Sequence, residues 1–281
     1  MKLFLLETFK TFSRWRTYIS FAVIALIVIL TEVVMKLSGD EIVNRMLKPF
    51  QRDFFISGNV LNVWLITAFI MNSLHIHIPF LITLVAGDMV SSEATAGTIR
   101  FLLIRPPSRI RIITAKYLTA LFYTAILVIF FAVLCVCLGL TLFGSGDLIV
   151  HHYGQFDVAF IPESEVPVRI FLSFIAAIWA MSVVASIAFL FSTLAENSIG
   201  PIIGTMAVVI VFLVLGSLPL DFFRMLKPYF FTTHMINLWQ QFLEVPIQWH
   251  VIVRSAIVLG IHNICLFLTA MFMFKRKDIK S

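Results

Sequence analysis

The hydrophobic positions of this chain fall into six long runs separated by shorter polar stretches. Each run is long enough to cross a hydrocarbon core as an α-helix, which takes about 20 residues. Because an even number of crossings returns the chain to its starting side, six spans would place both termini on one face of a membrane. We therefore predict an all-α integral membrane fold, a single domain over residues 1–281, with transmembrane helices at Tyr18–Met35, Val60–Ala86, Tyr117–Phe143, Val168–Leu194, Ile199–Leu220 and Val251–Phe274.

A shorter amphipathic pattern precedes the first run, in residues 3–16. Its apolar positions recur at helical spacing, and its polar positions lie largely opposite them; the former are Leu5, Phe9, Phe12 and Trp15, and the latter Lys10, Ser13, Arg14 and Thr17. This pattern is typical of a helix that lies in the membrane interface. The alternative is a plain extension of the first span.

The connection between the second and third runs, residues 87–116, is the most polar part of the chain, with five cations and two acids. We call it the elbow segment. Gly97 predicts the end of a first polar helix. A second short helix is expected at Thr98–Ile104, ended by Pro106-Pro107, and Ser108 is placed to cap the third span. The elbow segment is thus expected to be a stiff helical turn.

The other connections differ in character. Residues 36–59 mix charged and apolar positions and indicate an amphipathic helical piece, residues 144–167 are Gly-rich and acidic and indicate a loop, and residues 195–198 leave room for a tight turn. Residues 221–250 carry eight aromatic side chains and two prolines. Aromatic residues favour the headgroup level, so we expect short helices there that lie on or dip into the outer leaflet.

Composition supports a membrane location and indicates the orientation. The chain is 60% hydrophobic and 13% charged, with a mean hydropathy of +1.00, whereas soluble domains are typically about 25% charged. The N-terminal segment, the elbow segment and the C-terminal tail carry four, five and four of the 21 lysines and arginines. The positive-inside bias places these three segments in the cytoplasm. The net charge of +6 forms no single basic face, so we expect no nucleic-acid partner.

The elbow segment also carries a family resemblance. Glu93, Gly97-Thr98, Phe101-Leu102-Leu103, Pro107-Ser108-Arg109 and Lys116 resemble, in order and spacing, the signature between the second and third spans of type-2 ABC exporter permeases. The resemblance implies that this segment is a coupling helix docking on a separate ATPase, that two permeases pair, and that the outer aromatic segment is re-entrant. The residues it implies for coupling are Asp88, Glu93, Gly97, Thr98, Arg100, Arg105, Pro107, Ser108 and Arg109.

The resemblance leaves alternatives open for individual residues. Glu93 is expected to pair with a cation on the partner or on the elbow segment itself. The arginines of this segment would contact either an acidic ATPase surface or anionic lipid headgroups. No phosphate-binding G-x-x-x-x-G-K-[ST] loop is present, so ATP and Mg would be bound by the partner, and this chain is expected to bind no cofactor or metal.

The same resemblance implies a pathway for a lipid, a peptide or a drug-like cargo. Candidate pathway residues are Trp64, Phe69, Met71, His75 and Trp179. We place Glu32 and Asp88 at span ends, which leaves no carboxyl at mid-membrane for catalysis. The predicted protein is therefore a non-enzymatic permease subunit in the cytoplasmic (inner) membrane of a prokaryote. The alternatives are a secondary transporter or channel, which would call for mid-membrane carboxylates or a broken helix pair, and a membrane scaffold or immunity protein.

Overall fold

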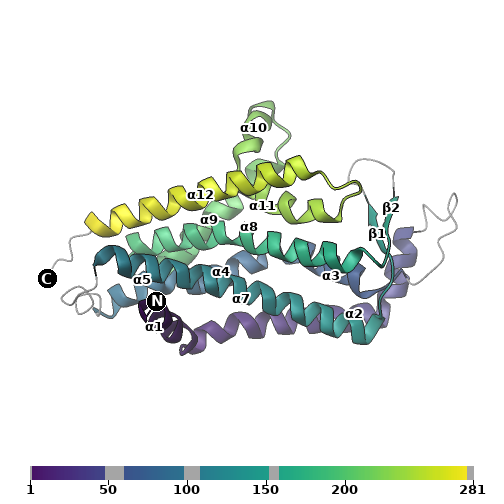
Figure 1. Ribbon diagram of the computed structural model, residues 1–281, viewed down its shortest axis with the longest axis horizontal. Helices are drawn as coiled ribbons and strands as arrows, with labels where there is room; N and C mark the ends of the chain where they lie inside the picture. The colour runs from purple at the N-terminus through teal and green to yellow at the C-terminus, as the bar shows by residue number, and fades with distance from the viewer. Residues whose placement is uncertain (1, 48–59, 98–107, 152–157, 277–281) are drawn as a thin grey trace.

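The computed structural model describes residues 2–47, 60–97, 108–151 and 158–276, and these residues are almost entirely helical (Figure 1). The elements in chain order are α1 (Lys2–Phe12), α2 (Trp15–Leu47), α3 (Val63–Ser73), α4 (His77–Ala86), α5 (Asp88–Thr95), α7 (Arg109–Phe143), β1 (Leu148–His151), β2 (Val158–Ile161), α8 (Val166–Leu194), α9 (Ile199–Ser217), α10 (Asp221–Leu226), η1 (Lys227–Tyr229), α11 (Phe231–Gln240), η2 (Gln241–Leu243) and α12 (Trp249–Arg276).

Several of these helices have the length and apolarity of membrane spans, which confirms a multi-pass membrane protein. Among the described residues, α2, α7, α8, α9 and α12 each meet both criteria. The predicted second span is a broken pair instead of one helix: α3 and the helices from His77 to Thr95 meet at a bend of 61°. Pro79 lies in the first turn of α4, just after the break, and its ring would clash with the carbonyl four residues earlier in a continuous helix.

Helix α8 is the centre of the bundle. In the most apolar 18-residue stretch of α8, 72% of the residues are buried, whereas the same fraction is 17% in α9 and 22% in α12. Half of the buried residues of α8 are alanine or serine, which let neighbouring backbones approach closely: Ser173, Ala176, Ala177, Ala180, Ser182, Ala185, Ser186, Ala188 and Ser192. The helices around α8 therefore expose much of their apolar surface outward, as helices in lipid do.

The connections between spans agree only partly with the predictions. Residues 221–250 form the expected series of short helices, α10, η1, α11 and η2. Residues 144–167, predicted to be a loop, contain an antiparallel hairpin in which Leu148 pairs with Ile161 and Val150 with Ala159. The short apolar run in each strand was overlooked because the glycines and acids dominate the composition. The helical piece predicted after the first span is continuous with it, since α2 runs to Leu47.

Helix α1 is separate from α2, as the amphipathic pattern predicted, and it lies at the same end of the elongated bundle as α5 and the C-terminal end of α12 (Figure 1). Its apolar side chains Leu5 and Phe9 are exposed, at 57% and 74%. Its polar residues Glu7 and Thr11 are buried. These two polar side chains of α1 thus pack against protein.

Candidate functional site

Four charged side chains form a closed ring where α1, α5 and α7 meet. Lys116 of α7 lies 2.7 Å from Oε2 of Glu7 and 2.8 Å from Oε1 of Glu93. Lys10 of α1 lies 3.0 Å from Oε1 of Glu7 and 3.3 Å from Oε1 of Glu93. Two ammonium groups thus alternate with two carboxylates. We call Glu7, Lys10, Glu93 and Lys116 the charge ring.

The inner side of the charge ring is shielded from solvent. The side chains of Lys116 and Glu7 are each 3% exposed and that of Glu93 is 7% exposed, whereas that of Lys10 is 38% exposed. Lys116 also donates to the carbonyl of Met89 at 3.2 Å, so each of its three N–H donors has an acceptor. A buried ammonium tolerates this position because its hydrogen bonds are complete.

The ring shifts the protonation of its members on α1. Burial alone would raise the pKa of Glu7, but the charges and hydrogen bonds of Lys116 and Lys10 outweigh it, and the pKa is lowered from 4.5. Burial alone would lower the pKa of Lys10, but its contacts with Glu7 and Glu93 raise it above 10.5. The charged forms of both side chains are therefore favoured near neutral pH.

A second ion pair joins the α1–α2 junction to α5. The guanidinium of Arg14 donates to Oδ2 of Asp88 and to the hydroxyl of Ser92, each at 3.0 Å. Asp88 is 7% exposed. Because Asp88 opens α5 and Glu93 lies near its end, the two carboxylates hold both turns of this helix against the N-terminal segment.

Helix α5 is also held from its other side by α8. The hydroxyl oxygen of Ser192 accepts the backbone N–H groups of Val90 and Ser91, each at 3.0 Å. The residue at the cap position of α5, Gly87, has no side chain to fill this role. Ser192 thus caps α5 from another helix, and it satisfies donors that would otherwise be orphaned in the first turn. Helix α5 is consequently fixed to α1, α7 and α8 at once.

Helix α5 is the first part of the elbow segment, and Gly97 lies just beyond its end. Gly97 has a φ of +66°, a left-handed conformation that favours glycine, and it ends α5 as predicted. Of the predicted coupling residues, Thr98, Arg100, Arg105 and Pro107 lie outside the described residues. Ser108 occupies the cap position of α7, but its side chain makes no capping hydrogen bond, so that part of the prediction was wrong. Arg109 donates to the carbonyl of Lys275 at the end of α12, at 3.3 Å.

The structure does not bring the five predicted pathway residues together. Trp64 and Met71 are buried in the core, at 6% and 5% exposure, whereas Phe69 and Trp179 are exposed at 44% each. His75 lies in the break between α3 and α4 and contacts the carbonyl of Asn72. The reason is that Trp64 and Met71 lie on the face of α3 that packs inward, whereas Phe69 lies on the opposite face.

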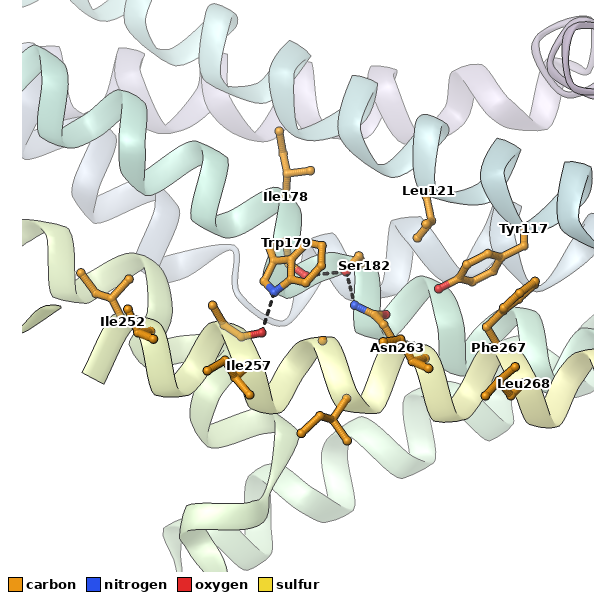
Figure 2. A pocket seen from close by; sticks show the side chains of 15 residues that line it. Tyr117, Leu121, Ile178, Trp179, Ser182, Ile252, Ile257, Asn263, Phe267 and Leu268 are labelled. Atoms are coloured by element: carbon orange, nitrogen blue, oxygen red, sulfur yellow. Dashed lines mark hydrogen bonds between the residues drawn. The ribbon is translucent and has the colours of Figure 1, made fainter. Parts of the chain in front are cut away.

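Trp179 lines an apolar groove of about 870 Å³ between α7, α8 and α12 (Figure 2). Its indole N–H donates to the carbonyl of Ala256 at 3.0 Å. The polar side chains beside the groove bond to one another, since Asn263 donates to Ser182 at 2.7 Å and its carbonyl oxygen accepts from Ser186 at 2.6 Å. With these groups satisfied, the walls of the groove are left apolar, formed by Leu121, Ile178, Ile257, Ile261, Phe267 and Leu268, among others.

Glu32, predicted to lie at the end of a span, lies seven residues before the end of the candidate span in α2. It belongs to the candidate span of α2, which extends from Trp15 to Gly39. It is 1% exposed, and neither carboxylate oxygen has a hydrogen-bond partner among the described residues. The helix continues beyond Met35, where the predicted span ended.

Sequence reasoning found two members of the charge ring, Glu93 and Lys116, and missed the two on α1. Glu93 pairs with a cation of the elbow segment, one of the two predicted outcomes. Glu7 was overlooked although it is the sole acid of α1. Its spacing from Thr11, one helical turn, was a detectable signal of a polar face that seeks partners within the protein.

Comparisons with known proteins assign no activity to these features. A family model described as "Protein of unknown function (DUF2705)" matches residues 24–280. A protein of Bacillus subtilis (strain 168), named "Uncharacterized protein YhcI", is 28% identical over 116 residues, which cover 41% of this chain and 37% of that protein. The chain thus aligns with little more than a third of this relative. The family match includes Glu93 and Lys116, whereas α1 precedes it.

Proposed function

Since the chain belongs to the DUF2705 family of proteins of unknown function, we propose its activity from its architecture: it is the membrane-spanning permease subunit of an ATP-driven exporter. In this proposal, five long apolar helices and the bent pair α3–α4 form six spans, with both termini and the elbow segment in the cytoplasm. Two copies, or this chain and a related permease, pair in the inner membrane of a prokaryote. A separate ATPase docks on the elbow segment and binds ATP and Mg.

The observation that carries the proposal is the way α5 is held. A coupling segment has to pass a push on to the spans, and it does so only if it is rigidly joined to them. Helix α5 forms the first part of the elbow segment and is attached to α1 and α7 through the charge ring and to α8 through Ser192. A displacement of the elbow segment would therefore move all three helices together. Lipid anchoring alone would not require these buried attachments.

The apolar groove beside Trp179 supports the class of cargo. Its walls offer dispersion contacts and few polar groups, and the polar side chains nearby already have partners. Such a surface suits an acyl chain or another extended apolar group better than a hydrophilic solute. We propose hydrophobic or amphipathic cargo on this ground.

Co-purification and coupled activity test the proposal. The tagged protein, extracted in mild detergent, is expected to bring down an ATPase subunit. Replacing Glu93 with Gln keeps the shape of the side chain but removes a charge from the ring, so ATP hydrolysis by the complex should continue while transport falls. The matched control is Glu163→Gln, which removes one acid from the far end of the bundle. Transport that falls equally in both variants would contradict the coupling role.

Accessibility of the elbow segment provides a second test. Thr95 is exposed at the end of α5, and a cysteine placed there should react with a membrane-impermeant thiol reagent only after the cells are opened. Labelling in intact cells would place the elbow segment outside and end the proposal.

A secondary transporter remains a second candidate because of two observations. Glu32 is a buried carboxyl within a span, and the pair α3–α4 is a broken helix, and both features occur where secondary transporters bind coupling ions. The two candidates differ in their energy source. Export that persists in vesicles without nucleotide, and that is lost in Glu32→Gln, would favour the secondary transporter.

A further inference from the structure

A second pocket lies at the end of the bundle where α1 and α7 begin, and it is not part of the charge ring. Its volume is about 600 Å³. Helix α1 contributes its first turn and α7 contributes one face; the lining residues are Lys2, Leu3, Phe4, Ile110, Arg111, Thr114, Ala115 and Leu118. This lining combines two cations and a hydroxyl with apolar side chains.

The charge of this pocket is uncompensated. Lys2 and Arg111 are both exposed, and neither has an ion-pair partner within the part of the chain that the structure describes, nor does an acid belong to the pocket's described lining. By contrast, Lys10, Arg14 and Lys116 are all paired with carboxylates. The pocket therefore has a positive potential that favours an anion between its two walls.

The pocket also continues into an apolar stripe along α7. Leu118, Phe122 and Ile129 are exposed at 46%, 41% and 50%, and spacings of four and seven residues place them on one face of the helix. The ring of Phe4 lies 5.7 Å from that of Phe122, edge to face, and extends the apolar wall across to α1. From Leu118 to Ile129 the stripe is about 16 Å long, close to half of a 30 Å hydrocarbon core.

We propose that this pocket binds an anionic phospholipid. The phosphate lies between Lys2 and Arg111, within reach of the Thr114 hydroxyl, and one acyl chain follows the stripe on α7. A soluble phosphate would satisfy the cations but leave the apolar side chains uncovered, and a zwitterionic lipid would return a positive charge to the site. The occupant that matches both the charge and the stripe is a lipid with a net negative headgroup.

The proposal is tested on the full-length protein in detergent by native mass spectrometry, with phosphatidylglycerol and phosphatidylcholine of identical acyl chains as probes. Wild-type protein should bind phosphatidylglycerol more tightly. Each cation near a membrane surface strengthens the attraction of an anionic lipid, so Lys2→Gln/Arg111→Gln should weaken phosphatidylglycerol binding on the order of 30-fold, and each single change about 5-fold. Lys2→Arg/Arg111→Lys, which keeps both charges, should retain the preference.

The matched control is Arg16→Gln/Lys275→Gln, which removes two cations from α2 and α12 outside the pocket. An equal loss in this control would show that the lipid responds only to overall charge and would overturn the proposal. Competition provides the second arm: glycerol phosphate, which lacks acyl chains, should not displace the lipid. Displacement at comparable concentration would identify a soluble anion as the occupant instead. Neither arm depends on ATP or transport, so the outcome is independent of the proposed function.

Discussion

Replacing Lys116 with Met tests whether the charge ring is a structural unit. The change keeps the length of the apolar stem but removes the ammonium group that contacts Glu7 and Glu93 at 2.7 and 2.8 Å. Both carboxylates, 3% and 7% exposed, then keep only Lys10 as a cationic partner in the ring, and its side chain is 38% exposed. The fold must either carry poorly compensated buried charge or admit water between α1 and α7.

The expected loss of stability in Lys116→Met follows from the burial of its ion pairs with Glu7 and Glu93. Removing one partner of a buried ion pair typically costs about 3–5 kcal/mol, because the other charge stays in a poorly solvated site. At roughly 2 °C per kcal/mol, the slope for a larger chain, the melting temperature should fall by about 6–10 °C. Lys10→Met removes the same kind of charge from the solvent-exposed side of the ring and should cost no more than about 1 kcal/mol.

The assay is thermal unfolding of the purified protein in detergent, followed by intrinsic fluorescence. A double substitution, Glu7→Gln/Lys116→Met, should recover part of the loss, since it removes one of the stranded carboxylates together with the cation. The reasoning would be refuted if Lys116→Met were as mild as Lys10→Met, or if the double variant were less stable than Lys116→Met by the full cost of Glu7→Gln alone.

Three further changes test separate parts of the structure. Glu32→Met should stabilise the protein by about 1–3 kcal/mol, because it replaces a buried carboxyl that has no partner among the described residues with an apolar side chain. Chemical denaturation measures the change in the free energy of unfolding, and a loss of stability would reveal a partner of Glu32. Ser192→Ala should cost about 1–3 kcal/mol, because it leaves the N–H groups of Val90 and Ser91 without their acceptor, whereas Ser192→Thr, which keeps the hydroxyl, should cost less. The lowered pKa of Glu7 contributes stability that is present above pH 4.5 and is lost as the pH falls through the pKa of Glu7 in the folded protein. The melting temperature of Glu7→Gln should therefore depend less on pH below 4.5 than that of wild type. Identical pH profiles of the two proteins would contradict the pairing.

The membrane character of this chain is a local property and could be predicted from the sequence. The number of consecutive apolar residues decides whether a helix can cross a bilayer, and this requires no knowledge of neighbours. The end of α5 at Gly97 was predictable for a similar reason, since a left-handed backbone conformation there requires a glycine. The short helices of residues 221–250 followed from prolines and aromatics in the same local way.

The partners of the polar side chains were decided only by the tertiary structure. Glu7 and Lys116 are 109 positions apart in the chain, and Lys10 and Glu93 are 83 apart. Whether such residues meet depends on the rotation of each helix about its axis and on which helices pack together, and neither is encoded in the composition of a single segment. For this reason the amphipathic pattern predicted helix α1 but not the burial of Glu7 against α7 and of Thr11 against α5. A run of apolar residues indicates that a helix lies in the membrane, but only the packing of the helices determines which side chains it contacts.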